Sequence, residues 1–350
     1  MRWLDPGWRF EHPRGVTRYS MLDLCSVKEG GNAAESFRNA LDLARHAERW
    51  GYTRFWLAEH HNMEGIASAA TSVLIGHVAG GTERIRVGSG GVMLPNHAPL
   101  IVAEHYGTLA TLYPGRIDLG VGRAPGSDGA TAHAIRRSLN REEDFPLQVR
   151  ELLGYLGPEQ PGQKVRAVPG QGTNVPVWLL GSSTYSAQLA AAMGLPFAFA
   201  AHFAPQDMVE ALRLYRRYFQ PSQYLSEPYS AVGVPLVAAD TDEEARRLAT
   251  SPYQRFLRLI RGQRLLTPPP VDSMDGLWTS QERALVEMRL GAAIVGGPET
   301  LVTKIAALLK EVEVDEVIFV SDLYRHADRL RSYEIAMEAI RSVDKAGTLL

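Results

Sequence analysis

Cysteine is almost missing from this sequence, which has Cys25 alone among its 350 residues. A single thiol cannot form an internal disulfide, and it cannot supply a cysteine-based zinc or iron–sulfur site. So little cysteine is typical of a protein in a reducing compartment. We therefore expect a cytoplasmic protein.

The sequence also lacks an excess of charge and a long apolar run. Its 37 basic and 39 acidic side chains give a formal net charge of −2. Proteins that bind nucleic acid or anionic membranes carry a basic excess, so we expect neither partner. No apolar run approaches the ~18 residues that cross a membrane. Residues 1–18 lack the continuous apolar stretch of a signal peptide, and we expect an extension ahead of the first strand.

Strand-like and helix-like segments alternate along most of the chain. The predicted strands are 19–25, 54–59, 85–94, 116–122, 175–180, 197–202, 230–239 and 314–320. The predicted helices are 33–50, 68–80, 99–112, 142–156, 184–193, 205–219, 242–261 and 327–343. Length alone is compatible with two or three domains. Strands separated by helices pair in parallel, however, and eight such units favour one α/β domain over 19–350, a closed (β/α)8 TIM barrel.

One segment, about 262–291, interrupts this alternation between the seventh and eighth predicted strands. It contains three consecutive prolines, Pro268 to Pro270, and turn-forming residues around Gly276. A long segment of this kind is either a functional lid or a surface insertion, and its length does not separate the two. In a barrel it would lie near the mouth of the active site.

The second predicted strand ends in Glu59, His60 and His61, at the carboxyl end where a barrel enzyme places its site. Adjacent strand residues point to opposite faces, so at most one histidine faces the mouth, and a zinc site is not expected. One interpretation is an acid/base histidine, because histidine titrates near neutrality. The other is a pair of loop histidines with structural hydrogen bonds.

Glycines mark the third and fourth predicted strands. A Gly-Ser-Gly-Gly run ends in Gly90 and Gly91, and glycine weakens a strand unless a backbone or ligand comes close. A flat cofactor and a bulge both explain this run. The fourth strand ends in Gly122 and Arg123 within a glycine-rich loop. Arginine there suits a phosphate, with a surface ion pair as the alternative, whereas the G-x-G-x-x-G spacing of a dinucleotide site is absent.

Hydroxyl groups gather where the fifth predicted strand meets its helix, at Ser182, Ser183 and Ser186. Hydroxyls and free backbone N–H groups at a helix start can bind an anion, and ordinary N-capping is the alternative. Tyr185 stands where the nucleophile elbow of a serine hydrolase requires a second glycine, so that class of enzyme is not expected.

The sixth predicted strand ends in His202 and Phe203, which either face a substrate or close the core. The features found so far are a phosphate site, a glycine-lined surface and one or two histidines at the mouth. The sequence shows no set of metal ligands and no obvious nucleophile. This pattern favours an enzyme whose chemistry comes from a phosphate-bearing cofactor.

Three stretches of the sequence resemble the bacterial luciferase-like flavin monooxygenases. They are 55–61 (FWLAEHH), 84–128, which includes GSGGVMLP and GVGRAPG, and 177–203, which includes GSSTYSA. The resemblance implies a TIM barrel that binds reduced FMN, forms a flavin C4a-(hydro)peroxide with O2 and oxygenates an organic substrate, in secondary or in general metabolism. The inward apolar residues and the proline-rich segment indicate that this substrate is hydrophobic. The resemblance also implies a homodimer, and a separate NAD(P)H:flavin reductase that supplies the reduced FMN.

The resemblance also implies roles for individual residues. His60 would transfer protons, and Gly90 and Gly91, often joined by a cis peptide in the family, would contact the flavin ring. The segment that begins at Gly262 would be a mobile lid. The FMN phosphate would be held by Arg123, Ser182, Ser183 and Ser186. Independently of the resemblance, we expect the substrate pocket to be lined by Glu59, His61, Trp178, His202 and Phe203.

Two positions depart from the family pattern. Gly122 stands where light-emitting members have a cysteine near the flavin, which argues against light emission but not against oxygenation. His133 stands where a second phosphate-binding arginine is common, which implies weaker or more pH-dependent FMN binding.

Two alternatives share the fold. An F420-dependent oxidoreductase of this type usually lacks the Glu-His-His ending. The presence of His60 together with Arg123 and the serines argues against a non-catalytic flavin-binding protein.

Overall fold

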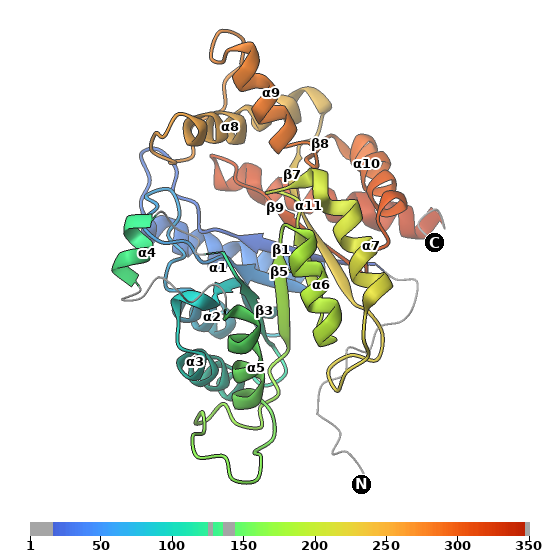
Figure 1. Cartoon of the computed structure of the whole chain (residues 1–350). Helices are drawn as coiled ribbons and strands as arrows, with labels where there is room; N and C mark the ends of the chain where they lie inside the picture. The colour runs from blue at the N-terminus through green and yellow to red at the C-terminus, as the bar shows by residue number, and fades with distance from the viewer. Residues whose placement is uncertain (1–16, 125–128, 136–143, 347–350) are drawn as a thin grey trace.

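A computed structural model describes residues 17–124, 129–135 and 144–346 (Figure 1). Its strands are β1 (Arg18–Asp23), β2 (Arg54–Leu57), β3 (Arg86–Met93), β4 (Ile117–Gly122), β5 (Val177–Gly181), β6 (Phe197–Ala200), β7 (Ser230–Ala238), β8 (Ile294–Gly296) and β9 (Glu316–Val320). Its helices are α1 (Ala33–Trp50), α2 (Thr71–Gly80), α3 (Pro99–Leu112), α4 (Gly129–Ile135), α5 (Phe145–Leu156), α6 (Thr184–Met193), α7 (Met208–Tyr218), α8 (Asp242–Ile260), α9 (Ser280–Arg289), α10 (Pro298–Glu311) and α11 (His326–Ala346). Two 3-10 turns, η1 (Leu94–Asn96) and η2 (Pro205–Asp207), precede α3 and α7.

The strands form a closed ring. They pair in chain order from β1 to β7, and β9 lies between β7 and β1, all in parallel. The helices surround this ring (Figure 1). The (β/α)8 TIM barrel expected from the sequence is therefore confirmed.

Two hydrophobic clusters lie on the two faces of the ring, because successive side chains of a strand point to opposite faces. The larger cluster packs the outward face of the strands against the surrounding helices. The smaller one fills the barrel interior and includes Leu22, Trp56, Trp178 and Ile318. The interior is thus packed with large side chains rather than hollow.

Helix α1 shows how local signals set the boundaries of an element. The Asn32 side chain accepts a hydrogen bond from the Glu35 N–H at 3.0 Å, which caps the first turn. Gly51 follows the last residue with φ at 86°, and its N–H donates to the carbonyls of Ala47 and Glu48. Glycine is favoured in this left-handed conformation, so the predicted stop at Gly51 is confirmed.

The segment between β7 and β9 differs from the prediction. Residues 262–291 were expected to form a lid or a surface insertion, and no helix was predicted there, but they contain α9, whose Thr279 and Glu282 form a capping box. Val286 of α9 packs against Leu257 of α8 and against Met274. After α9, the chain adds β8 and α10, and β8 pairs with the end of β7 outside the ring. The predicted insertion is confirmed, but it is a folded unit.

Two further expectations from the sequence were an N-terminal extension and the lack of a membrane-spanning run. Most of the expected N-terminal extension, 1–16, lies outside the described residues. Across the part of the chain that the structure describes, no helix combines the length and the apolar character that a membrane span requires.

Candidate active site

The carboxyl ends of the strands line a pocket, which we call the inner pocket. Leu22 of β1, Trp56 of β2 and Ile318 of β9 contribute to it from the barrel interior, and the last residues of β4, β5 and β6 form its sides. Its volume is about 1020 Å³, including space open to solvent. This is the end of the barrel at which enzymes of this fold place their sites.

Close packing explains the two glycines of β3. The Gly90–Gly91 peptide bond is cis, and the register between β3 and β4 shifts beside it. A Cβ on Gly91 would lie 2.7 Å from the carbonyl oxygen of Gly120, and a Cβ on Gly90 would lie 2.7 Å from Cδ1 of Leu22. Both glycines also line the inner pocket. The irregularity that the glycine pattern indicated is present, and it leaves a pocket side that carries no side chains.

One end of the inner pocket combines a cation with a helix start. The Arg123 guanidinium lies 4.5 Å from the centroid of the Tyr185 ring and has no carboxylate partner among the described residues. Ser183 is the N-cap residue of α6, but its hydroxyl makes no capping hydrogen bond. The Ser186 hydroxyl donates to the Ser183 carbonyl at 2.8 Å. The first N–H groups of α6 therefore have no side-chain cap, an arrangement that favours an anion.

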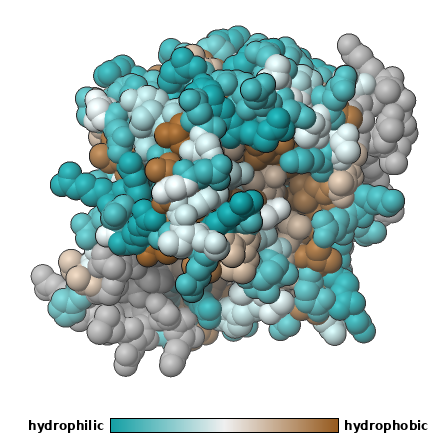
Figure 2. Space-filling view, turned by 90° about the horizontal axis from the view of Figure 1, so that it is seen from above, coloured by the Kyte–Doolittle hydropathy of each residue, from teal (hydrophilic) through white to brown (hydrophobic). Residues whose placement is uncertain are grey.

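A second pocket, which we call the outer pocket, lies beside the first. It is lined by β7, α8, α9 and the segments that follow β1, β2 and β9. Most of its residues are apolar, among them Met63, Phe256 and Leu259. Seen from above, apolar side chains are visible in hollows among the polar residues of the surface (Figure 2). His202 and Phe203 line both pockets, so the two pockets share a boundary.

Two histidines face the outer pocket, His60 after β2 and His202 after β6. Nδ1 of His202 lies 3.3 Å from the carbonyl oxygen of Gly233. Because a carbonyl oxygen only accepts, Nδ1 carries the proton and Nε2 is left as an acceptor. Burial lowers the pKa of His202 to about 4, against the opposing effect of the Gly233 hydrogen bond. His202 is therefore neutral at pH 7.

The buried Glu59 carboxylate joins three segments at the end of β2. Its Oε1 lies 2.7 Å from Nε2 of His61 and 2.8 Å from Nε2 of His97, and its Oε2 accepts from the Met93 N–H at 3.3 Å. Burial alone would raise the pKa of Glu59, but the hydrogen bonds from the two histidines outweigh it and lower that pKa to about 2. The ligand atoms of Glu59, His61 and His97 lie within 4.8 Å of one another, a spacing that a metal ion could bridge. Hydrogen bonding by itself accounts for this cluster.

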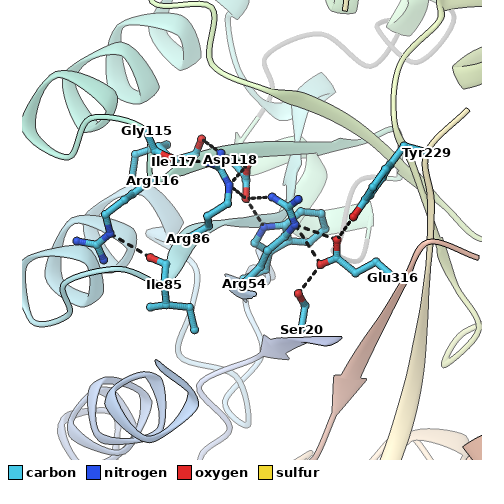
Figure 3. Close-up of polar contacts among 11 residues, drawn as sticks. Ser20, Arg54, Ile85, Arg86, Gly115, Arg116, Ile117, Asp118, Tyr229 and Glu316 are labelled. Atoms are coloured by element: carbon cyan, nitrogen blue, oxygen red, sulfur yellow. Dashed lines mark hydrogen bonds and ion pairs between the residues drawn. The ribbon is translucent and has the colours of Figure 1, made fainter. Parts of the chain in front are cut away.

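Charged side chains also fill the amino-terminal end of the barrel (Figure 3). Nη1 of Arg54 lies 2.7 Å from Oδ2 of Asp118, and Nε of Arg54 lies 3.0 Å from Oε1 of Glu316. Arg86 also contacts Asp118, and the Tyr229 hydroxyl donates to Glu316 at 2.8 Å. Burial alone would raise the pKa of Asp118, but the two arginines outweigh it and hold that pKa below its ordinary value. We call these five residues the basal network.

Comparison with known proteins identifies the family. The family model described as luciferase-like monooxygenase matches residues 17–316. The chain belongs to this family. Uncharacterized protein YvbT of Bacillus subtilis (strain 168) is 58% identical over 92% of this chain and 96% of that protein. A luciferase-like monooxygenase of Escherichia coli (strain K12) is 51% identical over 91% of this chain and 96% of that protein.

Other similar proteins have more specific names. An N-acetyl-S-alkylcysteine monooxygenase of Bacillus subtilis (strain 168) is 30% identical over 93% of this chain and 98% of that protein. The structure of apo-MsnO8 is 33% identical, with a TM-score of 0.84, over 93% of this chain and 99% of that one. Another solved structure is the oxygenating constituent of 3,6-diketocamphane monooxygenase from Pseudomonas putida, in complex with FMN. It is 19% identical, with a TM-score of 0.67, over 92% of this chain and 97% of that one. At that identity the last likeness shows the fold alone.

In this member of the family, the structure brings together the residues that were expected to bind FMN, with one exception given below. The inner pocket is lined by Gly90, Gly91, Gly122, Arg123, Ser182, Ser183 and Ser186. His60, expected to transfer protons, lines the outer pocket. The expectation that at most one histidine of the Glu-His-His ending faces the mouth agrees with this placement, because His61 turns to Glu59 instead.

Four residues predicted for the site lie elsewhere. Trp178 points into the barrel, but it stands early in β5, so it is fully buried and packs edge-on against Trp56 at 5.1 Å. Glu59 and His61 bind each other and line neither pocket. His133 is exposed on α4 and lines neither pocket, so its expected contact with the FMN phosphate finds no support in the structure.

Two residues at the mouth of the barrel were missed in the sequence analysis. Arg289 ends α9 and lines the outer pocket. The capping-box pattern at Thr279 and Glu282 could have revealed α9 and hence the position of Arg289. His97 carried no such signal, because its contact with Glu59 joins residues 38 apart in the sequence.

Proposed function

We propose that this protein is a monooxygenase that uses reduced FMN and O2 to oxygenate a hydrophobic organic substrate. The observation that carries the proposal is the phosphate-binding end of the inner pocket. There, Arg123 has no carboxylate partner among the described residues, and it stands beside a helix start without a side-chain cap. A cation next to free helix N–H groups is a typical phosphate site.

The residues of the inner pocket fit FMN along its length. Arg123 and the first turn of α6 would hold the phosphate, with Ser183 as a hydrogen-bond partner. The isoalloxazine ring would lie against Gly90 and Gly91, where no side chain intervenes. When bound, reduced FMN supplies the electrons that activate O2.

The histidines stand where protons must move between the cofactor side and the substrate side. His202 lines both pockets and is neutral, and its Nε2 can accept a hydrogen bond from a ligand. His60 lines the outer pocket, where it would give a proton to the substrate or take one from it. The apolar lining of the outer pocket would hold the body of the substrate and exclude water.

A two-component enzyme needs a source of reduced flavin. We expect a separate NAD(P)H:flavin reductase to supply it to a homodimer in the cytoplasm. Family membership supports the two-component scheme, and the scarcity of cysteine supports the compartment.

F420 is the competing cofactor. An F420-dependent secondary alcohol dehydrogenase has the same fold, with 15% identity and a TM-score of 0.67 over 93% of this chain and 99% of that one. The names of the sequence relatives as monooxygenases and the Glu-His-His ending favour FMN over F420.

Cofactor titration tests the proposal directly. The protein is titrated with FMN and with F420, and binding is followed by cofactor fluorescence. We expect FMN to bind and F420 to bind much more weakly. Preferential binding of F420, or no binding of FMN in either redox state, would reject the proposal.

Turnover tests the role of His60. Reduced FMN, ¹⁸O2 and an N-acetyl-S-alkylcysteine, the substrate named for one relative, are supplied, and the ¹⁸O content of the product is measured. A general acid/base contributes roughly 10²–10⁴ in rate, so His60→Ala should lower turnover by at least about 100-fold while FMN affinity stays unchanged. His77→Ala, on the exposed face of α2, is the control and should leave both unchanged. Equal turnover in the two variants would refute the role of His60.

A further inference from the structure

The ionisable side chains that line the outer pocket leave one positive charge unbalanced. Its lining contains five ionisable side chains, which are His60, His202, Arg255, Arg289 and Asp322. Nη1 of Arg255 lies 2.8 Å from Oδ2 of Asp322, so this pair cancels. His202 is neutral at pH 7. Arg289 is therefore the permanent cation of the lining that no carboxylate partner balances within the described residues.

Aromatic rings hold the Arg289 side chain in place. Its guanidinium carbon lies 5.0 Å from the centroid of the Phe203 ring and 5.5 Å from that of the Phe256 ring. One N–H, on Nη1, donates to the carbonyl oxygen of Phe203. A guanidinium carries five N–H donors, so the others remain available to a ligand. Cation–π contacts of this kind orient an arginine but do not neutralise it.

The other arginines near α9 are arranged differently. Arg283 lies 2.7 Å from Glu287, and Arg261 lies 2.7 Å from Glu282. Arg289 is half-buried without such a partner, and burial lowers its pKa. A cation that is partly removed from water is stabilised by an anion that meets it there. The arrangement therefore leaves an anion site beside an apolar pocket.

We propose that Arg289 binds a carboxylate of the substrate, so that the outer pocket accepts an apolar organic molecule with one carboxylate group. The planar fork of a guanidinium matches a carboxylate with two parallel hydrogen bonds. The apolar body lies between α8, α9 and β7, and the part of the molecule that reacts points toward His202 and the inner pocket. This inference rests on the proposed function for the identity of the ligand as substrate, but not for the presence of the anion site.

Matched probes test the anion site without flavin. Octanoate and octan-1-ol share one chain and differ in charge, so each is titrated into the full-length protein by calorimetry. We expect octanoate to bind more tightly than octan-1-ol. A charged hydrogen-bond pair corresponds to roughly tenfold to a hundredfold in affinity, so Arg289→Gln should weaken octanoate binding by that factor and leave octan-1-ol binding unchanged. Arg289→Lys should fall between the two.

Arg283→Gln is the matched control, because Arg283 lies on the same helix but is paired at the surface. It should change neither affinity. Equal binding of the two probes, no binding of octanoate, or an equal loss of both probes in Arg289→Gln would overturn the proposal. Tighter binding of octyl phosphate than of octanoate would overturn the carboxylate assignment. FMN affinity is measured separately, so a protein that binds octanoate but no FMN would refute the proposed function and leave the anion site standing.

Discussion

The two ends of the barrel differ in whether their charged side chains are paired with opposite charges. At the amino-terminal end, the side chains of Arg54, Asp118 and Glu316 are at most 2% exposed, and each is paired with another at 3.0 Å or less. At the carboxyl end, Arg123 and Arg289 border the two pockets without a carboxylate partner among the described residues. The same residue type thus serves two purposes in one fold.

The difference follows from the cost of burying charge. A fully buried ion costs several kcal/mol unless it is paired and hydrogen-bonded, so each charge of the basal network depends on its partners. At the mouth, a ligand can provide the missing charge, so an unpaired arginine there is a binding group. The basal end should therefore control stability, and the mouth should control binding, which is the division expected for this fold.

The largest effect should come from the basal network. Asp118→Ala leaves Arg54 and Arg86 without their shared carboxylate, and removal of one partner from a buried ion pair costs about 3–5 kcal/mol. We expect a loss of this size in the free energy of unfolding, measured with urea. As a control, Glu287→Ala removes an exposed partner of Arg283 and should cost under about 1 kcal/mol. Similar losses in the two variants would break the comparison.

Glu59 tests whether pairing or position decides the effect of a charge on stability, because it is a paired, buried charge that lies at the mouth. Its pKa is about 2, below its ordinary 4.5, so the associated stability is present above about pH 4.5 and is lost as the pH falls toward 2. We expect Glu59→Gln to lower the free energy of unfolding by up to about 3 kcal/mol at pH 7, and the difference from the wild type to shrink toward pH 3.5. Glu64→Gln, in an exposed pair with Arg264, is the control. A difference that stays constant with pH would contradict the prediction.

The smallest effect should appear at Arg123 and only in binding. Arg123→Gln should weaken FMN binding by about tenfold, as one charge-assisted contact is lost, and change the free energy of unfolding by less than about 0.5 kcal/mol. Arg217 lies over the Tyr218 ring at 5.5 Å, much as Arg123 lies over Tyr185, but outside both pockets. Arg217→Gln should therefore leave FMN affinity unchanged, and an equal effect of the two substitutions would argue against a phosphate site at Arg123.

Elements whose ends are set by local signals could be predicted closely. The helices expected at 99–112 and 184–193 have those bounds in the structure. Pro99 opens one at its first turn, and a left-handed Gly194 closes the other. Strand β8 has three residues, too few to show a strand period, so the unit from α9 to α10 was missed although the capping box of α9 was a usable signal.

The residues of the candidate site also separate into those that could be predicted from local sequence and those that could not. Residues directly after a strand, such as His60 and Arg123, could be predicted, because parallel strands bring their carboxyl ends to one edge. How deep a side chain lies along the barrel could not be predicted. Trp178 was therefore expected in the pocket, although it lies buried beneath the pocket. Partners far apart in sequence, such as Glu59 with His97, were also out of reach, because no local pattern encodes their contact.

The boundary that His202 and Phe203 form between the two pockets has a thermodynamic consequence. A ligand that shifts either side chain changes the surface offered to the other ligand, and any coupling that results is reciprocal. If a bound cofactor changes the affinity for the second ligand by some factor, the second ligand must change the affinity for the cofactor by the same factor. The size of that factor is then set at these two side chains, and it is the same whichever pocket fills first.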